Sequence, residues 1–262
     1  MNPGDLLETF RVRLGATQSN VQVTLFQADL MRANLDVMKA ALREVQSIAA
    51  SAGTPRNARD AVIARYNARL AEISQFFPVF FIFESAFRSF TAARLALAYG
   101  DDQWWRPVRD AVVQGRDPLR LHRLGTLPAR RDVVDTVAHL VRSMGQNAAG
   151  ITTCYDLLEG GTLAHVERLI ASHWSVIDSA LRQPLVPGPI TASGFGDLFR
   201  IVRHARNDAY HHRMIGNRAR AIGIVERLVD MLDISLAARI QALDAAKIPP
   251  LPFTIPVQSR HA

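Results

Sequence analysis

Apolar residues recur at helical spacing over most of the chain. Between residues 21 and 50 they fall three or four positions apart with charged residues between them, which predicts one long amphipathic helix. Gly53, Thr54 and Pro55 predict a stop and a restart, and residues 56–75 show a second pattern of the same kind. Together the two segments predict a helical hairpin within residues 1–76.

The following segment, residues 77–99, is apolar nearly all round at its start, which is typical of a helix in the centre of a bundle. Gly100 predicts its end. The most apolar run, Phe76 to Phe83, contains Pro78 and stops at Glu84, far short of the roughly 20 residues that cross a bilayer. We therefore expect a buried helix here and no contact with a membrane.

Helical spacing resumes in the second half of the chain, while residues 183–196 are rich in proline and glycine and predict a linker. No alternating run is long enough to predict a sheet. We expect an all-α helical bundle in which the N-terminal hairpin packs on a core of residues 77–246, followed by a proline-rich extended tail at 247–262. The helices expected in the second half cover residues 130–147, 162–181, 194–213 and 218–246.

With 262 residues, of which 48% are apolar, the chain is long enough to bury a substantial core. Cys154 is the single cysteine, so no internal disulfide can form. Residues 1–20 lack the uninterrupted apolar run of a signal peptide. These features predict a protein of the reducing cytoplasm.

The chain carries a net charge of +7, and arginine supplies nearly all of the positive charge, because Lys39 and Lys247 are its lysines. The planar guanidinium matches the geometry of phosphate, which favours a polyanionic partner. A GC-rich genome also produces an arginine-rich composition. The clustering of the charge along the chain therefore has to decide between this explanation and a polyanionic partner. Residues 106–131 contain seven arginines and two acids, and residues 200–220 contain six arginines, three histidines and one acid.

The second of these windows contains Arg206-Asn207, three further residues and then His211. This spacing is the pattern of the HEPN ribonucleases, which the chain resembles. The flanking residues lengthen the match, because Ala205-Arg206-Asn207, His211-His212-Arg213 and Asn217-Arg218 are similar to the final signature of the Abi-like abortive-infection proteins of that superfamily.

Two blocks upstream resemble the same family in the same order. Residues 156–163 are similar to its glycine-containing turn into a helix, and residues 84–105 are similar to its helix with a buried glutamate and arginine, followed by aromatic residues. Over residues 77–232 the resemblance implies a HEPN-like core that cleaves RNA in phage defence or as a toxin. It implies catalytic residues Arg206, His211 and Asn207. The supporting or RNA-binding residues are expected to be His212, Arg203, Arg213, Asn217, Arg218, Glu84 and Arg88.

These residue types suit metal-independent RNA cleavage on chemical grounds. An imidazole that titrates near neutral pH can take the proton from a ribose 2′-hydroxyl or give one to the leaving 5′-oxygen, and His211 is the candidate for this role. A guanidinium stabilises the charge that builds on the non-bridging phosphate oxygens, and Arg206 is the candidate here. Because the nucleophile is internal to the RNA, no cofactor is expected, and the products would be a 2′,3′-cyclic phosphate and a 5′-hydroxyl.

Helix geometry adds a constraint. Five positions along an ideal helix correspond to about 140° of rotation, so Arg206 and His211 would point apart. Either the helix is distorted near Tyr210, or two copies of the chain pool their arginine and histidine across a two-fold axis. We predict a homodimer in which the two motifs face each other.

Three alternatives stay open. His204, Asp208 and His212 are four residues apart on one helical face and could hold a first-row metal in a metal-dependent hydrolase. The chain could also be a non-catalytic RNA- or protein-binding HEPN module. Glu84 and Arg88 fit a simple helical ion pair, or a buried pair that orients Arg206 or His211.

Two further expectations concern local structure and regulation. Arg56-Asn57 has no histidine at the required distance and is expected to be an exposed helix start, and the Trp104-Trp105 pair and Trp174 are expected in the core or in a dimer interface. The sequence leaves open whether an antitoxin protein, a regulatory RNA or a phage trigger controls the activity.

Overall fold

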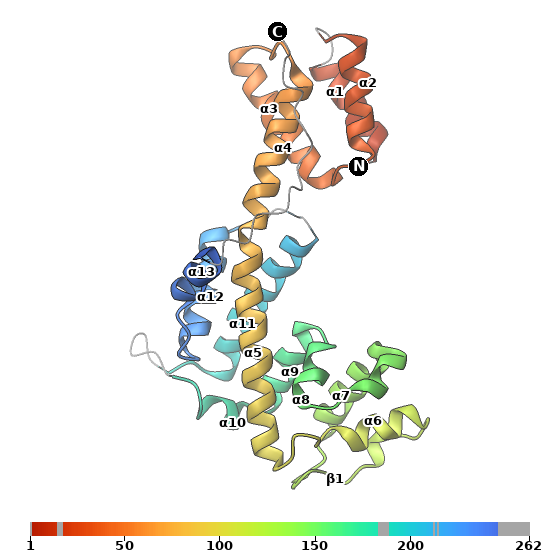
Figure 1. Cartoon of the computed structure of the whole chain (residues 1–262), viewed down its shortest axis with the longest axis vertical. Helices are drawn as coiled ribbons and strands as arrows, with labels where there is room; N and C mark the ends of the chain where they lie inside the picture. The colour runs from red at the N-terminus through yellow and green to blue at the C-terminus, as the bar shows by residue number, and fades with distance from the viewer. Residues whose placement is uncertain (1, 15–17, 183–188, 212, 214, 246–262) are drawn as a thin grey trace. The chain divides into compact units, whose positions relative to one another are not determined.

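The structure is a computed structural model that describes residues 2–14, 18–182, 189–211, 213 and 215–245. These residues form α-helices, short 3₁₀ helices and one two-stranded ladder, so the all-α prediction is confirmed (Figure 1). The chain divides into two compact units. The predicted tail at 247–262 lies outside the described residues.

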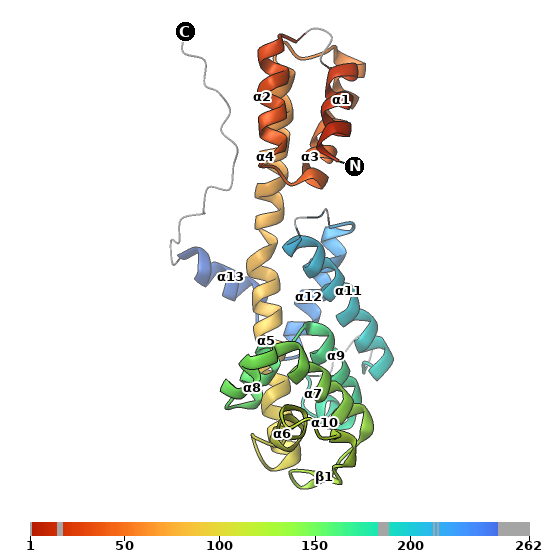
Figure 2. The ribbon, with the colours of Figure 1, turned by 90° about the vertical axis from the view of Figure 1, so that its right-hand side faces the viewer.

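Of the described residues, the first unit comprises 2–14, 18–77, 206–211, 213 and 215–216. Its four N-terminal helices pack α3 against α4 and α1 against α2 (Figure 1), and the turned view of Figure 2 shows that α2 also lies beside α4 and α1 beside α3. They are α1 (Pro3–Arg13), α2 (Asn20–Leu30), α3 (Leu35–Ala52) and α4 (Ala58–Ser74). The residues of the expected two-helix hairpin form three helices, α2, α3 and α4, and α1 was not anticipated by the sequence pattern.

The prediction of one continuous helix over residues 21–50 is wrong. The chain breaks after Met31, and the side chain of Asn34 accepts hydrogen bonds from the amides of Asp36 and Val37, both at 3.1 Å. This cap satisfies amides that have no partner within a new helix, so it starts α3 at a point where the apolar spacing continues. The periodicity alone could not reveal the break.

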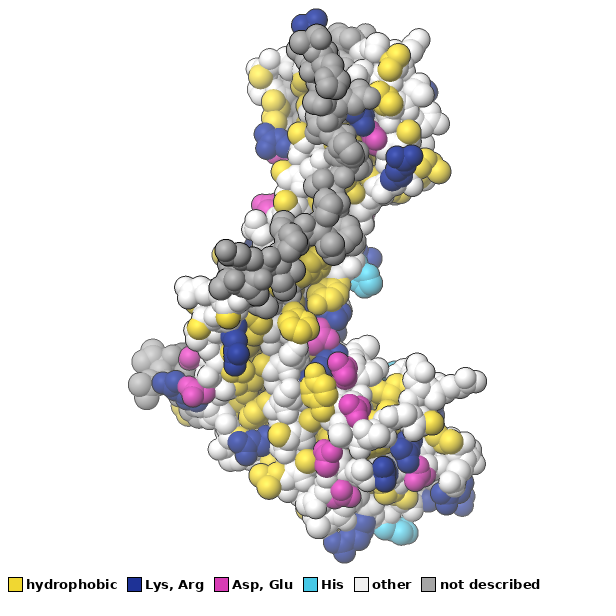
Figure 3. All heavy atoms as spheres, in the orientation of Figure 1, with side chains coloured by type: hydrophobic (Ala, Val, Ile, Leu, Met, Phe, Trp, Pro, Cys, Tyr) yellow, Lys and Arg dark blue, Asp and Glu magenta, His cyan; other side chains and the backbone are white. Residues whose placement is uncertain are grey.

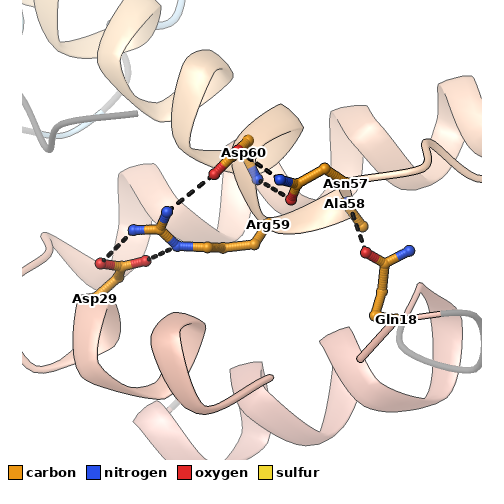
Figure 4. A network of polar contacts seen from close by, with 6 residues as sticks. All are labelled: Gln18, Asp29, Asn57, Ala58, Arg59 and Asp60. Carbon is orange, nitrogen blue, oxygen red and sulfur yellow. Dashed lines mark hydrogen bonds and ion pairs between the residues drawn. The ribbon is translucent and has the colours of Figure 1, made fainter. Parts of the chain in front are cut away.

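A buried polar network joins α2 to the start of α4 (Figure 4). Arg59 Nε lies 2.7 Å from Asp29 Oδ2, and Arg59 Nη2 lies 3.0 Å from Asp29 Oδ1, so the pair is bidentate. A third bond links Arg59 Nη1 to Asp60 Oδ1 at 2.9 Å. Asn57 caps α4 by accepting from the Asp60 amide at 3.1 Å, and Arg56 is exposed, which confirms the predicted helix start.

The second unit comprises Pro78–Ala205 and Asn217–Ala245. Two of its helices, α5 and α11, extend into the first unit by their first two and last five residues, respectively. The elements are α5 (Phe76–Tyr99), α6 (Arg106–Val113), η2 (Pro118–Arg120), β1 (Arg123–Leu124), β2 (Leu127–Pro128), α7 (Arg131–Met144), η3 (Gly145–Gly150), α8 (Cys154–Glu159), α9 (Leu163–Ser172), α10 (Trp174–Asp178), α11 (Ala192–Tyr210), α12 (Arg218–Asp230) and α13 (Leu236–Ala245).

Aromatic residues form two groups within the largely aliphatic core of the second unit. Trp104 and Trp105 are fully buried, as predicted, and the Trp104 ring stacks on Tyr99 at 4.3 Å. Where α5 meets α11, four phenylalanine rings pack with centroids 4.9 to 5.8 Å apart, and the Trp174 ring packs at a tilt against Phe195 at 5.3 Å. The four rings belong to Phe83, Phe87, Phe195 and Phe199.

Two helices expected in the second unit are wrong in detail, and one feature of this unit was not expected. The helix expected over 162–181 is interrupted at His173, and the helix expected over 218–246 is interrupted between α12 and α13, where Asp233 has a φ of 60°. A two-residue antiparallel ladder, β1 with β2, also forms. Each feature is too short to leave a periodic signal in the sequence.

The helical stretch Ala58–Tyr99 includes one window whose length and composition would allow a membrane crossing, and 39% of that window is buried. The core helix of a globular protein passes the same test, so this finding is weak evidence. Within α5, Phe80 and Phe83 are buried whereas Phe81 is 60% exposed. The expectation of no membrane contact stays a prediction.

Candidate active site

The candidate site is built at the C-terminal end of α11. Phe195, Phe199 and Val202 repeat at helical spacing on the buried side of this helix, and Ala209 continues the buried positions toward its end. The polar residues of the motif therefore fall on the less buried positions of the last turn. Arg206, Asn207 and Asp208 are half-buried there, and Tyr210 is 39% exposed.

The structure brings Arg206 together with Asn207 and Tyr210. The guanidinium carbon of Arg206 lies 4.0 Å from the centroid of the Tyr210 ring, which is a cation–π contact. Arg206 Nη1 also donates to Asn207 Oδ1 at 3.3 Å. The Tyr210 ring meets Phe77 edge-on at 5.3 Å. The guanidinium is thus held on one face by an aromatic ring that is itself packed.

His211 follows the last residue of α11, and its side chain is exposed. Its amide still donates to the Asn207 carbonyl at 2.9 Å, so the backbone keeps helical hydrogen bonding through this residue. The Arg213 amide then donates to the Asp208 carbonyl at 2.6 Å, a spacing of five residues that closes helix C-termini. The helix therefore ends at the motif, with the histidine at its edge.

Two other predicted site residues have partners within the protein. Arg203 Nε lies 2.8 Å from Glu167 Oε2 on α9, and the side chain is 21% exposed. Asn217 caps α12 by accepting from the Arg220 amide at 3.0 Å. Arg218 is half-buried at the start of α12, Arg213 is exposed, and His212 lies outside the described residues. A contact of these residues with RNA stays a prediction.

Glu84 and Arg88 form a short ion pair on α5. Arg88 Nη2 lies 2.6 Å from Glu84 Oε1 and also donates to the Gly161 carbonyl at 2.9 Å. The Arg88 side chain is 6% exposed and the Glu84 side chain is 16% exposed. The two residues therefore form a buried pair and not a solvated helical pair. It joins α5 to the turn before α9. That it orients Arg206 or His211 stays a prediction.

A histidine pair in the second unit gives no signal in the sequence. His139 Nδ1 lies 2.9 Å from His165 Nε2, and His165 Nδ1 accepts from the Thr162 amide at 3.1 Å, at the start of α9. Burial lowers the pKa of His165 to about 4, with His139, Arg168 and Arg88 adding to the effect. The two histidines are 26 residues apart, and no motif in the sequence links them.

A second buried histidine lies at the break between α9 and α10. His173 Nε2 lies 2.7 Å from the Tyr99 hydroxyl, and burial lowers the pKa of this histidine. Burial likewise raises the pKa of Tyr99 and that of Cys154 to about 12, so the Cys154 thiol stays protonated at neutral pH. A thiolate nucleophile at Cys154 is therefore not favoured.

The described residues contain no cluster of three or more histidine, cysteine, aspartate or glutamate side chains able to hold a metal ion. The alternative of a metal bound by His204, Asp208 and His212 includes a residue outside the described part of the chain. It therefore stays an alternative that an experiment has to test.

No protein-family model, curated protein or solved structure matches the chain. The resemblance to the Abi-like proteins therefore depends on the motifs themselves.

Proposed function

We propose that the protein is a metal-independent endoribonuclease of the HEPN type, similar to the Abi-like abortive-infection proteins. The observation that supports this proposal best is the arrangement of Arg206 at the end of α11. Its guanidinium lies against the Tyr210 ring and next to Asn207, and His211 follows at the helix edge with an exposed side chain. A phosphate-binding cation and a proton-transfer group thus occur within six residues.

In the proposed reaction His211 accepts the proton of a ribose 2′-hydroxyl, and the 2′-oxygen attacks the adjacent phosphorus. The bond from phosphorus to the 5′-oxygen breaks, that oxygen takes a proton from water, and His211 releases the proton that it accepted to water. The products are a 2′,3′-cyclic phosphate and a 5′-hydroxyl. Arg206 donates to the non-bridging oxygens, whose negative charge grows as the new bond forms.

Asn207 and Tyr210 act as positioning residues in this scheme. Each fixes a different part of the Arg206 side chain, because the Asn207 oxygen accepts from Nη1 and the Tyr210 ring lies under the guanidinium plane. A guanidinium with fewer accessible rotamers loses less entropy when it binds phosphate. This assigns Asn207, a catalytic candidate in the sequence, to the support of Arg206.

The site is proposed to be shared by two copies of the chain. Because helical hydrogen bonding continues through the His211 amide, Arg206 and His211 leave the backbone about 140° apart. A homodimer can pair the arginine of one copy with the histidine of the other. Two inactive variants, Arg206→Ala and His211→Ala, test this directly.

When these two variants are mixed and allowed to exchange subunits, half of the dimers are mixed and carry one intact composite site. RNA cleavage should then return to about a quarter of the wild-type rate. Each variant alone should stay inactive. No recovery, with subunit exchange verified by differently tagged copies, would show that each chain uses its own arginine and histidine.

The primary test is expression of wild type, Arg206→Ala and His211→Ala, with growth and RNA integrity as readouts. Wild type should arrest growth and yield fragments with cyclic phosphate ends, and both variants should lose both effects. Arg56→Ala is the matched control, since Arg56 is also an exposed arginine before an asparagine but has no histidine at the motif spacing. A variant at the motif that remains fully active would refute the site.

Two rival functions give different results in the same assay. A metal-dependent hydrolase that uses His204, Asp208 and His212 would stop in excess EDTA and would lose activity in His204→Ala. A non-catalytic module would bind RNA or protein and leave RNA intact. The family resemblance suggests a biological role in abortive infection or as a toxin. It also suggests that an antitoxin protein or a regulatory RNA controls the activity.

A further inference from the structure

A second group of arginines lies in the second unit, between α6 and α7. Residues 114–131 contain five arginines and one aspartate, so this stretch alone carries a charge of +4. Arginine and histidine side chains gather at the lower edge of the molecule in Figure 3, over the part that carries α6 and β1. We call Arg116, Arg120, His122 and Arg123 the basic loop surface.

The charges of this surface are exposed and poorly neutralised. All four side chains are exposed, and Arg120 is 88% exposed. Among the described residues, the ion pair of this surface joins Arg120 Nε to Asp117 at 3.9 Å, and the other oxygen of Asp117 accepts from the Leu119 amide at 3.0 Å. An excess of exposed like charges repels itself and favours the binding of an anion.

The backbone under the basic loop surface is firmly anchored. The Thr126 amide and hydroxyl both donate to the Tyr99 carbonyl, at 2.9 and 3.0 Å, and Leu124 is fully buried. The Arg116 amide donates to the Ala111 carbonyl at 2.8 Å. The arginines are therefore presented by an ordered scaffold.

Part of the basic loop surface is hollowed. A hollow of about 480 Å³ lies between the end of α6 and η2, and it is lined by Arg116 and Arg120 together with Asp117. Gly115, with a φ of 67°, forms part of its wall and leaves it open, since no atom lies near the position of a Cβ there. A concave, arginine-lined surface fits a polyanionic backbone better than a flat one, because several phosphates can contact it at once.

We propose that the basic loop surface binds the phosphate backbone of RNA, as a second contact separate from the Arg206–His211 motif. This inference rests on the proposed function for the identity of the polyanion. It adds that the protein contacts RNA phosphates outside the cleavage site. Recognition would be largely independent of base sequence, because guanidinium–phosphate contacts carry no base information.

The test compares two triple variants that remove the same charge. The first triple variant consists of Arg116→Gln, Arg120→Gln and Arg123→Gln and lowers the net charge from +7 to +4. The control triple variant lowers the net charge equally at three exposed arginines of the first unit, through Arg11→Gln, Arg13→Gln and Arg43→Gln. Both are made in the His211→Ala background so that labelled RNA stays intact. The first set should weaken binding about tenfold or more, and the slope of log K against log salt should fall by about 2.

The control triple should change the affinity less than about threefold. Equal weakening by both sets would show that only overall charge matters, and no weakening by the first set would also overturn the proposal. Because Arg123 Nη2 donates to the Thr126 carbonyl at 2.6 Å, the double variant Arg116→Gln, Arg120→Gln keeps this bond and should still weaken binding.

Failure of this proposal and failure of the nuclease proposal can be told apart. If the first triple variant, with His211 intact, cleaves RNA with an unchanged KM, the basic loop surface is not a substrate contact. The nuclease proposal is still supported by that result. If wild type binds RNA through this surface without cleaving it, the nuclease proposal fails, and the proposal that the surface binds RNA is supported. Arginine-dependent binding to phosphatidylserine vesicles or polyglutamate, with none to RNA, would overturn the assignment to RNA.

Discussion

The guanidinium of Arg206 lies 4.0 Å from the ring centroid of Tyr210, one helical turn further along α11. Substitution Tyr210→Ala removes this contact, whereas Tyr210→Phe keeps the ring. A cation–π contact contributes about 1 kcal/mol, so Tyr210→Ala should lower kcat/KM for RNA about fivefold. Tyr210→Phe should stay within about twofold of wild type. Equal losses in both variants would mean that the hydroxyl, and not the ring, supports the site.

His165 makes the stability of the second unit depend on pH. Its pKa is about 4 in the folded chain and about 6.5 when exposed, so the unfolded state binds more protons between these values. The stabilisation is therefore complete above pH 6.5 and is lost as the pH falls toward 4, by about 3 kcal/mol at most.

Burial lowers the pKa of His173 as well, so this residue contributes in the same direction. The comparison of wild type with His165→Gln isolates the effect of His165. Urea unfolding at pH 7.5 and pH 5 should show a smaller loss of stability for the variant than for wild type. A parallel pH dependence of the two proteins would contradict the assignment.

The bidentate pair of Arg59 and Asp29 stabilises the first unit through burial of two opposite charges. Asp29→Ala leaves Arg59 buried with Asp60 as its remaining carboxylate, so the free energy of unfolding should fall by about 2 to 4 kcal/mol. The double variant Asp29→Leu, Arg59→Met should lose less than Asp29→Ala alone. Arg65→Ala, which removes a half-exposed partner of Glu44, should cost less than about 1 kcal/mol in the same urea experiment.

Gly125 allows the hairpin between β1 and β2 to approach α5. A Cβ at this position would lie 2.4 Å from the Tyr99 carbonyl oxygen, and its φ is 53°. Gly125→Ala should therefore lower the melting temperature markedly, with a loss of roughly 2 kcal/mol or more. Gly115→Ala is the matched control, because its φ is 67° but no atom lies within 4 Å of the Cβ, so it should lose about 1 kcal/mol.

Local signals in the sequence determined the helical character of the chain and many element ends. Gly53 ends α3 with a φ of 85°, Asn57 caps α4, and Gly100 follows α5 with a φ of 68°, all at positions that the residue types predicted. These features depend on the conformational preferences of one or a few neighbouring residues. They can therefore be read without knowledge of distant contacts. The same holds for the motif at the end of α11, whose spacing is visible in the chain.

The tertiary structure alone decided which side chains meet across the fold. The bonds between His139 and His165, and between Arg203 and Glu167, join residues 26 and 36 positions apart. Each partner considered by itself looks like an ordinary surface residue, because the contact depends on how helices pack and not on local spacing. Burial of His165, and hence its altered pKa, follows from that packing. The sequence could supply the candidate groups, but only packing could assign their partners.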